Sequence, residues 1–268
     1  MTKPPKPAPR IKPASPATPE GERLSKHVAH LMACSRREAE QYIEGGWVNV
    51  NGVLAEEPML RVRDQTVTVD PHASLMLPTD VTLLLHKPPG FDTLATPAMA
   101  SKRLQPAQLC LTPASHWPHD PSKQRILRRH FAKLQAAVPL EQAASGLVVF
   151  TQDWRVLRKL TEDAAFIEHE LVVEVAGEVS AEALHALNGT WLERGQPLPL
   201  AKVSINSTLD TATRLRFVFK GPHTGLIAVL CDRVNLSILS IKRLRIGRVA
   251  LSNLPAGQWR YLQEGERF

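Results

Sequence analysis

The sequence contains few cysteines, and the three that it has are widely separated. Cys34, Cys110 and Cys231 have neither the close spacing of a metal site nor the even number of a disulfide framework. This usage is typical of a reducing compartment and predicts a cytoplasmic protein. A metal site is not predicted either, because His116 and His119 lie three residues apart with no third ligand in register.

Long apolar runs are absent as well. No segment approaches the roughly 20 apolar residues that a membrane-spanning helix needs, so no membrane contact is expected. The first twenty residues, MTKPPKPAPRIKPASPATPE, lack the apolar core of a signal peptide. Their prolines and lysines predict a disordered basic tail over residues 1–20, which is either inert or attracts phosphates without specificity. No exposed apolar heptad or edge-strand pattern stands out, so we expect a monomer.

What the chain does have is an excess of basic residues and enough apolar residues for a core. It has 268 residues, a formal net charge of +7, a pI near 9.5 and 43% apolar residues. The length fits one large domain or two smaller ones. The charge favours a polyanionic partner such as RNA or DNA, and the alternative is a basic protein without such a partner.

Residues 21–70 have the pattern of a small helix–helix–hairpin domain. Ser35 and Glu38 have the spacing of a capping box at the start of the second helix, which is predicted to end at Gly45–Gly46. Asn51–Gly52 predicts a tight turn between two short strands. The segment is therefore predicted to fold as one compact module.

The rest of the chain is predicted to form a second, larger domain. Residues 71–80 contain two helix-breaking prolines and are expected to be a linker. Strand and helix patterns are intermixed over residues 81–268, which predicts an α+β fold with a mixed or antiparallel central sheet. Pro106–Lys133 is poorly patterned and rich in Pro, His and Arg, so we expect an irregular insertion there.

The first domain resembles the alpha-L RNA-binding domain in the segments RLSKHVA, SRREAEQYI and VNVNG. The resemblance implies that Arg36 and Arg37 face RNA phosphates from the start of the second helix, where unpaired N–H groups add positive potential. Lys26 in the preceding helix would widen this surface. Such a domain recognises the shape and backbone of RNA rather than its sequence. The alternative is that these side chains are solvated surface charges.

The larger domain carries four motifs in an order that resembles the RsuA-type ribosomal RNA pseudouridine synthases. The branch that acts on large-subunit ribosomal RNA or transfer RNA is the most similar. The motifs are LLLHKPPGFDTL, LEQAASGLVVFTQD, HELVVEVAG and IKRLRIGRVALSNLPAGQWRYL. The family converts uridine to pseudouridine without a cofactor or a metal, so the resemblance implies structured ribosomal or transfer RNA as the partner and no cofactor. Lys87, in the retained KPPG loop, is expected to contact the RNA backbone.

Three residues on which the family depends are replaced in this chain. The catalytic Asp corresponds to Glu141, the Tyr beneath the base to Leu171, and the Arg that pairs with the Asp to Ala228. Glu keeps the acid but is one methylene longer, and a misplacement of about 1 Å can cost roughly a hundredfold in rate. If Glu141 faces an apolar wall with no cation nearby, its charged form is disfavoured and it is a poor nucleophile. If it instead reaches solvent, it stays charged but is badly aimed.

These substitutions predict an RNA-binding member of the family in which catalysis is lost or weak. The alternative is a divergent, active synthase on ribosomal or transfer RNA that uses Glu141 as its catalytic acid. The loss of all three groups together favours the first interpretation, because an exchange of one acid for another would by itself leave a slow enzyme.

Overall fold

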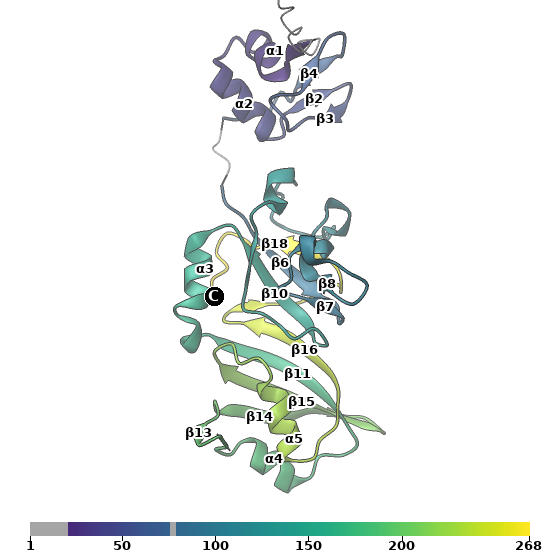
Figure 1. Ribbon diagram of the computed structural model, residues 1–268, viewed down its shortest axis with the longest axis vertical. Helices are drawn as coiled ribbons and strands as arrows, with labels where there is room; N and C mark the ends of the chain where they lie inside the picture. Colours follow the sequence, from purple (N-terminus) through teal and green to yellow (C-terminus); the bar gives the residue numbers. More distant parts are fainter. Residues whose placement is uncertain (1–20, 76–78) are drawn as a thin grey trace, which may run out of the picture. The chain divides into compact units, whose positions relative to one another are not determined.

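The structure is a computed structural model that describes residues 21–75 and 79–268 (Figure 1). The basic tail predicted over residues 1–20 lies outside the described residues, as does part of the predicted linker. The chain divides into two compact units between residues 78 and 79, a position within the predicted linker. Each unit is described by itself.

The first unit has two short helices followed by a small sheet. The helices are α1 (Leu24–Leu31) and α2 (Arg36–Glu44), and the sheet contains β2 (Val48–Val50), β3 (Val53–Leu54) and β5 (Val67–Val69). A further pair is formed by β1 (Glu22–Arg23) and β4 (Arg61–Val62). Apolar residues from both helices and the sheet form the core of this unit: Leu24, Val28, Ala29, Ala39, Ile43, Val48, Ala55 and Val62.

The local signals in this unit are confirmed. Ser35 caps α2, its hydroxyl accepts the Glu38 N–H at 3.2 Å, and the Glu38 carboxylate accepts the Ser35 N–H at 2.8 Å. The helix ends at Gly45, as predicted. Asn51 and Gly52 both have positive φ, 51° and 78°, which suits the tight turn between β2 and β3.

The second unit is built on one large mixed sheet, which confirms the α+β fold. Its strands in spatial order are β14 (Ala201–Thr208), β15 (Ala212–Lys220), β11 (Glu168–Ala176), β16 (Ile238–Ile246), β10 (Ser145–Thr151), β6 (Thr82–Lys87) and β18 (Trp259–Tyr261). The flanking strands are β9 (Gln135–Ala137) on β10 and β17 (Val249–Ala250) on β16. The remaining pairs are β7 (Phe91–Asp92) with β8 (Gln105–Pro106) and β12 (Leu192–Glu193) with β13 (Gln196–Pro197). Along the sheet, β10 and β16 run parallel and the other neighbours run antiparallel.

Helices pack on both faces of this sheet and bury a core on each. On one face, α4 (Ala181–Leu187) and α5 (Leu226–Arg233) cover β14, β15 and β11 (Figure 1). On the other face, α3 (Trp154–Thr161) packs against β10. Side chains that alternate along β10 point into the two cores in turn, as the strand period requires. Asp153 caps α3, because its carboxylate accepts the Arg155 N–H at 2.8 Å.

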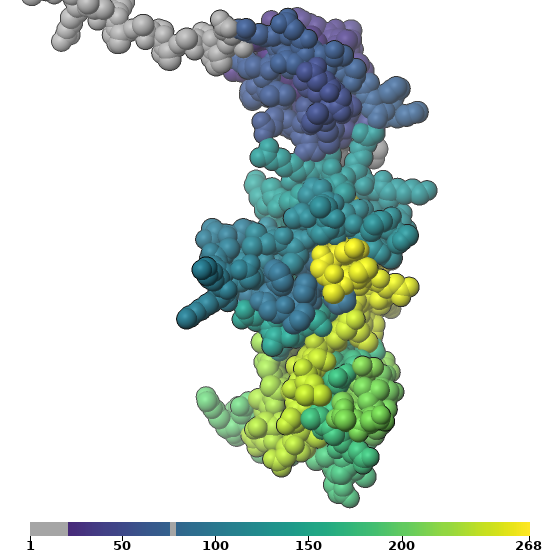
Figure 2. Space-filling view, turned by 90° about the vertical axis from the view of Figure 1, so that its right-hand side faces the viewer, coloured from purple at the N-terminus to yellow at the C-terminus, as the bar shows by residue number. Residues whose placement is uncertain are grey.

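The segment between β7 and β9 contains little regular structure. It has four 3-10 turns: η1 (Pro97–Met99), η2 (Ala107–Cys110), η3 (Pro113–Ser115) and η4 (Arg128–Phe131). Residues of this segment, blue to teal in Figure 2, form much of the visible surface of the second unit. The irregular backbone agrees with the sequence prediction. Its side chains are nevertheless fixed by many polar contacts to β18, which the sequence did not predict.

Candidate active site

Glu141 stands in the turn that connects β9 to β10. The turn enters through Val138, whose φ of 57° is a left-handed conformation that a β-branched residue rarely adopts. The buried Leu140 anchors the turn, and the Ala144 N–H closes it on the Glu141 carbonyl at 3.1 Å. The carboxylate is therefore presented from a fixed backbone at the start of a buried strand.

The carboxylate of Glu141 binds the N-terminus of a helix. Its Oε1 atom accepts the main-chain N–H of Gly225 at 2.8 Å. Gly225 has a φ of 81° and immediately precedes α5. The first N–H groups of a helix have no partner within the helix and carry partial positive charge, so a carboxylate there is stabilised. Glu141 thus caps α5 from a position 84 residues earlier in the chain.

A buried arginine, Arg243, lines the same pocket as Glu141. Arg243 in β16 donates to the carbonyls of Leu147 at 2.7 Å, Pro139 at 3.1 Å and Val138 at 2.9 Å. Burial lowers the pKa of Arg243 to about 10, and the charge of Glu141 opposes that shift. The interpretation that Glu141 has no cation nearby is therefore wrong, whereas the apolar wall is present, because Leu171, Phe219 and Ile227 line the same pocket.

Sequence reasoning missed Arg243 for an identifiable reason. The residue was visible in the KRLRIG segment, but only the parallel pairing of Gly146 with Arg243 brings β16 beside the turn of Glu141. Gly225 was missed in the same way, although a glycine just before an apolar helix is a signal for a helix start.

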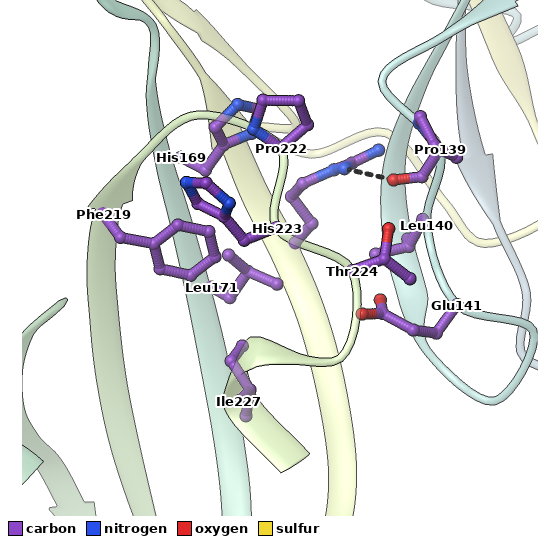
Figure 3. Close-up of a pocket in the computed structure, with 11 residues that line it drawn as sticks. Pro139, Leu140, Glu141, His169, Leu171, Phe219, Pro222, His223, Thr224 and Ile227 are labelled. Atoms are coloured by element: carbon purple, nitrogen blue, oxygen red, sulfur yellow. Dashed lines mark hydrogen bonds between the residues drawn. The ribbon is translucent and has the colours of Figure 1, made fainter. Parts of the chain in front are cut away.

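The pocket at this site is too small for a nucleobase. Its volume is about 20 Å³, which is room for about one water molecule. Typical ligand pockets measure roughly 300–1,000 Å³. Leu171, Phe219 and His223 are among the residues that line the pocket, as Figure 3 shows. Within this pocket, the structure therefore holds no cavity of nucleobase size.

His169 contributes an unusual polar group to the pocket wall. Its ring stacks on Phe219, with 6.1 Å between ring centroids and 25° between planes. The side chain is buried, and its Nε2 atom has no hydrogen-bond partner among the described residues. Burial, with the nearby charge of Arg243, lowers the pKa of His169 to about 3. The imidazole is therefore neutral at physiological pH.

The structure brings together two of the three substituted positions. Glu141 and Leu171 both line the pocket, Leu171 from the buried face of β11. Ala228 lies on α5, is exposed and does not line the pocket. Because this position of α5 is an alanine, α5 supplies no cation to the Glu141 carboxylate from here. The cation of the site comes instead from β16.

Lys87 has a structural role that the sequence analysis did not predict. The side chain is fully buried, and its Nζ atom donates to the carbonyls of Pro88, Phe91, Gln142 and Ala144. Burial is the main cause that lowers the pKa of this ammonium group, to about 8. An ammonium group enclosed by four carbonyls cannot reach a phosphate, so the predicted RNA contact of Lys87 is corrected. Its side chain joins the KPPG loop to the turn of Glu141.

The three basic residues proposed for the first unit lie on its surface. Arg36 and Arg37 are exposed and begin α2, as the sequence predicts. Lys26 is exposed on α1, and its ammonium group forms an ion pair with Glu22 at 2.9 Å. The structure thus leaves the two arginines accessible and gives the lysine a local counter-ion. Their contact with RNA stays a prediction.

Two further findings concern the residues that the structure describes. Over residues 21–75 and 79–268, no cluster of three or more His, Cys, Asp or Glu side chains has the arrangement of a metal site. In the same ranges, no helix is both long and apolar enough to cross a membrane.

Comparison with known proteins gives the class of each unit. The S4 domain family matches residues 22–67, which confirms the RNA-binding module expected from the sequence. A solved structure described as a pseudouridylate synthase aligns with 90% of this chain and 96% of its own, with a TM-score of 0.54 and 19% identity. The chain therefore combines an S4 domain with the fold of a pseudouridine synthase.

Sequence relatives named as pseudouridine synthases cover most of this chain. An uncharacterised RNA pseudouridine synthase of Aquifex aeolicus is 28% identical over 247 residues, which are 91% of this chain and 94% of the relative. Ribosomal large subunit pseudouridine synthase B of Pseudomonas aeruginosa is 26% identical over 95% of this chain and 63% of its own length. The resemblance to the RsuA-type RNA pseudouridine synthases is confirmed along nearly the whole chain.

Proposed function

We propose that this protein binds structured ribosomal or transfer RNA and that it isomerises uridine to pseudouridine weakly or not at all. It acts in the cytoplasm as a monomer, with no cofactor or metal. The observation that carries the proposal is the hydrogen bond of 2.8 Å between the Glu141 carboxylate and the Gly225 N–H. The acid at the catalytic position serves there as a helix cap.

The state of the pocket supports weak or absent catalysis. A base must leave its stack and enter an active-site pocket before its glycosidic bond can be attacked. The present pocket has a volume of about 20 Å³, and Leu171 offers neither the hydroxyl nor the aromatic face of the family's Tyr. A carboxylate already bonded to a helix N-terminus must also give up that contact before it can act on a sugar.

A divergent active enzyme is the second candidate, and Arg243 is the observation that favours it. The guanidinium lies in the same pocket as Glu141 and supplies a positive charge that the family takes from another element. A positive charge close to the acid is what the family resemblance implies for an active site. In this candidate, opening of the loop over residues 221–225 would admit the base.

The deciding experiment is a single-turnover assay on ribosomal and transfer RNA from a strain that lacks the related synthases. Pseudouridine is mapped by carbodiimide modification at high protein concentration. We expect no new pseudouridine, together with salt-dependent binding to the same RNA. A site-specific product that disappears in Glu141→Ala would establish the second candidate and refute the first.

A variant designed to restore the family's residues gives the matched positive control. It combines Glu141→Asp, Leu171→Tyr and Ala228→Arg in the same chain. Because Ala228 is exposed, an arginine fits there without repacking, whereas Tyr at Leu171 requires the pocket to open. Product from this variant, and none from the natural chain, would attribute the loss to these positions.

A further inference from the structure

Among the residues that the structure describes, positive charge is distributed very unevenly between the two units. Residues 21–75 contain six Lys or Arg and eight Asp or Glu, a net charge of −2. Residues 79–268 contain 23 Lys or Arg and 17 Asp or Glu, a net charge of +6. The long-range attraction of the described residues to a polyanion therefore comes from the second unit and not from the S4 domain.

Within the second unit, one segment accounts for the whole net charge of +6. The 32 residues from Lys102 to Lys133 contain seven Lys or Arg and a single acid, Asp120, which gives a net charge of +6. The rest of the unit has sixteen residues of each sign and is neutral. We name the segment from Lys102 to Lys133 the basic segment.

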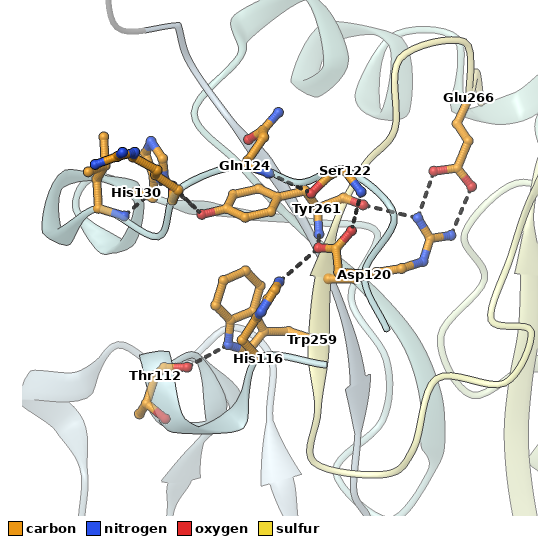
Figure 4. Close-up of polar contacts among 12 residues, drawn as sticks. Thr112, His116, Asp120, Ser122, Gln124, His130, Trp259, Tyr261 and Glu266 are labelled. Carbon is orange, nitrogen blue, oxygen red and sulfur yellow. Dashed lines mark hydrogen bonds and ion pairs between the residues drawn. The ribbon is translucent and has the colours of Figure 1, made fainter. Parts of the chain in front are cut away.

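The only acid of the basic segment, Asp120, has a buried side chain whose carboxylate is fully hydrogen-bonded. The carboxylate of Asp120 accepts the Tyr261 N–H at 2.9 Å and the Ser122 N–H at 2.9 Å, and it bonds the His116 ring at 2.8 Å (Figure 4). These contacts lower the pKa of Asp120 against the effect of its burial. The acid therefore fixes the segment to β18 and offers no negative charge at the surface.

Other polar contacts hold the segment against the sheet. The Trp117 N–H donates to the Trp259 carbonyl at 2.8 Å, and the His130 ring bonds the Tyr261 hydroxyl at 2.8 Å. Gln152 donates to the carbonyls of Arg129 and Ala132 at 2.7 and 2.6 Å. A segment with almost no regular structure is thus held in one arrangement, which reduces the entropy lost when it binds a partner.

Four cations of the basic segment face solvent without a counter-ion. Lys102, Arg103, Lys123 and Lys133 are exposed, and none forms an ion pair with another residue in the described ranges. On α3, by contrast, Arg158 and Lys159 are paired with acids one turn away. Cations that have no counter-ion repel one another, and an anionic partner relieves this repulsion.

We propose that the basic segment is the main RNA-backbone contact of the second unit. The partner is RNA because the proposal rests on the proposed function, and because regularly spaced phosphates match a stretch of cations that has no surface acid. The S4 domain, with a net charge of −2, then adds a local contact at Arg36 and Arg37. Of these two contacts, the one in the second unit would contribute more of the electrostatic attraction to RNA.

The experiment compares two charge-neutralised variants of the full chain. The test variant carries Gln at Lys102, Arg103, Lys123 and Lys133. The control variant carries Gln at four exposed cations from the neutral remainder of the second unit: Lys202, Lys220, Arg248 and Arg267. Binding of a fluorescent transfer RNA transcript is measured by anisotropy between 50 and 300 mM salt, and thermal unfolding checks that both variants fold.

We expect the test variant to bind at least tenfold more weakly at 0.1 M salt. Its plot of log affinity against log salt should become shallower by about 3, because each lost phosphate contact removes roughly 0.7–0.9 from the slope. The control variant should change affinity less than threefold. An equal loss in both variants would overturn the proposal, since net charge and not this segment would then set the affinity.

A second measurement uses the natural chain and does not depend on variants. Lysine acetylation with and without bound transfer RNA is read by mass spectrometry. Protection of Lys102, Lys123 and Lys133, with Lys202 and Lys220 still reactive, is the expected result, and the reverse pattern would refute the proposal. If the natural chain shows no salt-dependent RNA binding at all, the proposed function fails as well, and the two failures are thereby distinguished.

Discussion

Glu141 joins two segments of the second unit through one carboxylate. Its bond to the Gly225 N–H satisfies a donor at the start of α5 and places negative charge at the positive end of the helix. Removal of such a cap costs about 0.5–2 kcal/mol. The residue therefore has a measurable structural role whether or not it has a chemical one.

The first prediction separates these roles. Glu141→Ala should lower the free energy of unfolding by about 1 kcal/mol or more, whereas Glu141→Gln, which keeps an acceptor oxygen, should lose less. The measurement is urea unfolding of both variants. Glu264→Ala, at an exposed acid in a turn outside the helices, is the control and should stay within about 0.5 kcal/mol. Equal stability of Glu141→Ala and the natural chain would contradict the capping role.

Because the imidazoles of His169 and His130 are buried, the free energy of unfolding depends on pH in the acid range. The pKa of His169 falls from the ordinary 6.5 to about 3 through burial and then Arg243, and burial lowers that of His130 to about 4. Between pH 6.5 and these values, the unfolded chain binds protons that the folded chain lacks. Lowering the pH through this window therefore favours unfolding, and the stabilisation is fully present above about pH 6.5.

The second prediction follows from that window. The free energy of unfolding should fall between pH 7 and pH 5, and His169→Phe should reduce the fall because it removes one titrating group while keeping the stack on Phe219. Urea unfolding at the two pH values gives both differences. A variant whose pH dependence matched that of the natural chain would show that His169 is not responsible.

At the scale of elements, the site depends on the close parallel approach of β10 and β16. Gly146 has a φ of 116°, and a Cβ atom at this position would overlap the main chain of Arg243. No side chain fits between the two strands, so glycine is required by space as well as by conformation. This approach brings Arg243 into the pocket of Glu141.

The third prediction tests that requirement. Gly146→Ala should destabilise the protein by about 2–4 kcal/mol, because strands must separate to accept the methyl group. Gly177→Ala is the matched control, since Gly177 also has a positive φ, 73°, but has open space around its Cβ position. The control should cost about 1–2 kcal/mol from conformation alone. Similar losses in both variants, measured by thermal unfolding, would mean that the strands can move apart easily.

The comparison of sequence and structure is clearest for these elements. The capping box of Ser35 and Glu38, the Asn51–Gly52 turn and the cap at Asp153 were predictable because each depends on residues within a few positions. The α+β fold also followed from the order of strand and helix patterns. The partners of Glu141 did not, because they lie 84 and 102 residues away and meet it only through the sheet.

Lys87 shows a second reason for failure. A lysine in a loop motif is usually solvated, and nothing in the sequence marks the four carbonyls that surround its ammonium group. Three of those carbonyls, of Pro88, Gln142 and Ala144, lie outside strands, and the fourth, of Phe91, begins the short strand β7. Irregular backbone created the binding site for this side chain, and irregular backbone is the part of a fold that sequence patterns describe least.

At the scale of the whole molecule, the charges of the described residues indicate that the two units would contribute differently to the proposed RNA binding. Residues 21–75 have a net charge of −2, so we expect them to depend on local contacts at the start of α2, while residues 1–20 add a net charge of +3 in the sequence. The second unit, with a net charge of +6, supplies the long-range attraction. Substitutions in the two units should therefore differ in their effects.

The fourth prediction concerns the S4 domain. Arg36→Glu combined with Arg37→Glu should weaken RNA binding at least tenfold and make the salt dependence shallower by about 1.5–2, because two phosphate contacts are lost. The same measurement on Arg23→Glu, an exposed arginine away from α2, provides the control and should show a small change. Unchanged affinity and slope in the double variant would show that RNA contacts another face of this domain.

The bond between Glu141 and Gly225 also has a consequence for how such chains change over generations. When an acid stabilises the start of a helix, substitutions that remove the acid destabilise the fold, even when no reaction depends on the acid. Descendants would keep the acid while the pocket around it continued to drift. An acid at this position can then be retained for its role in folding. Its presence in a related sequence is therefore no proof of synthase activity.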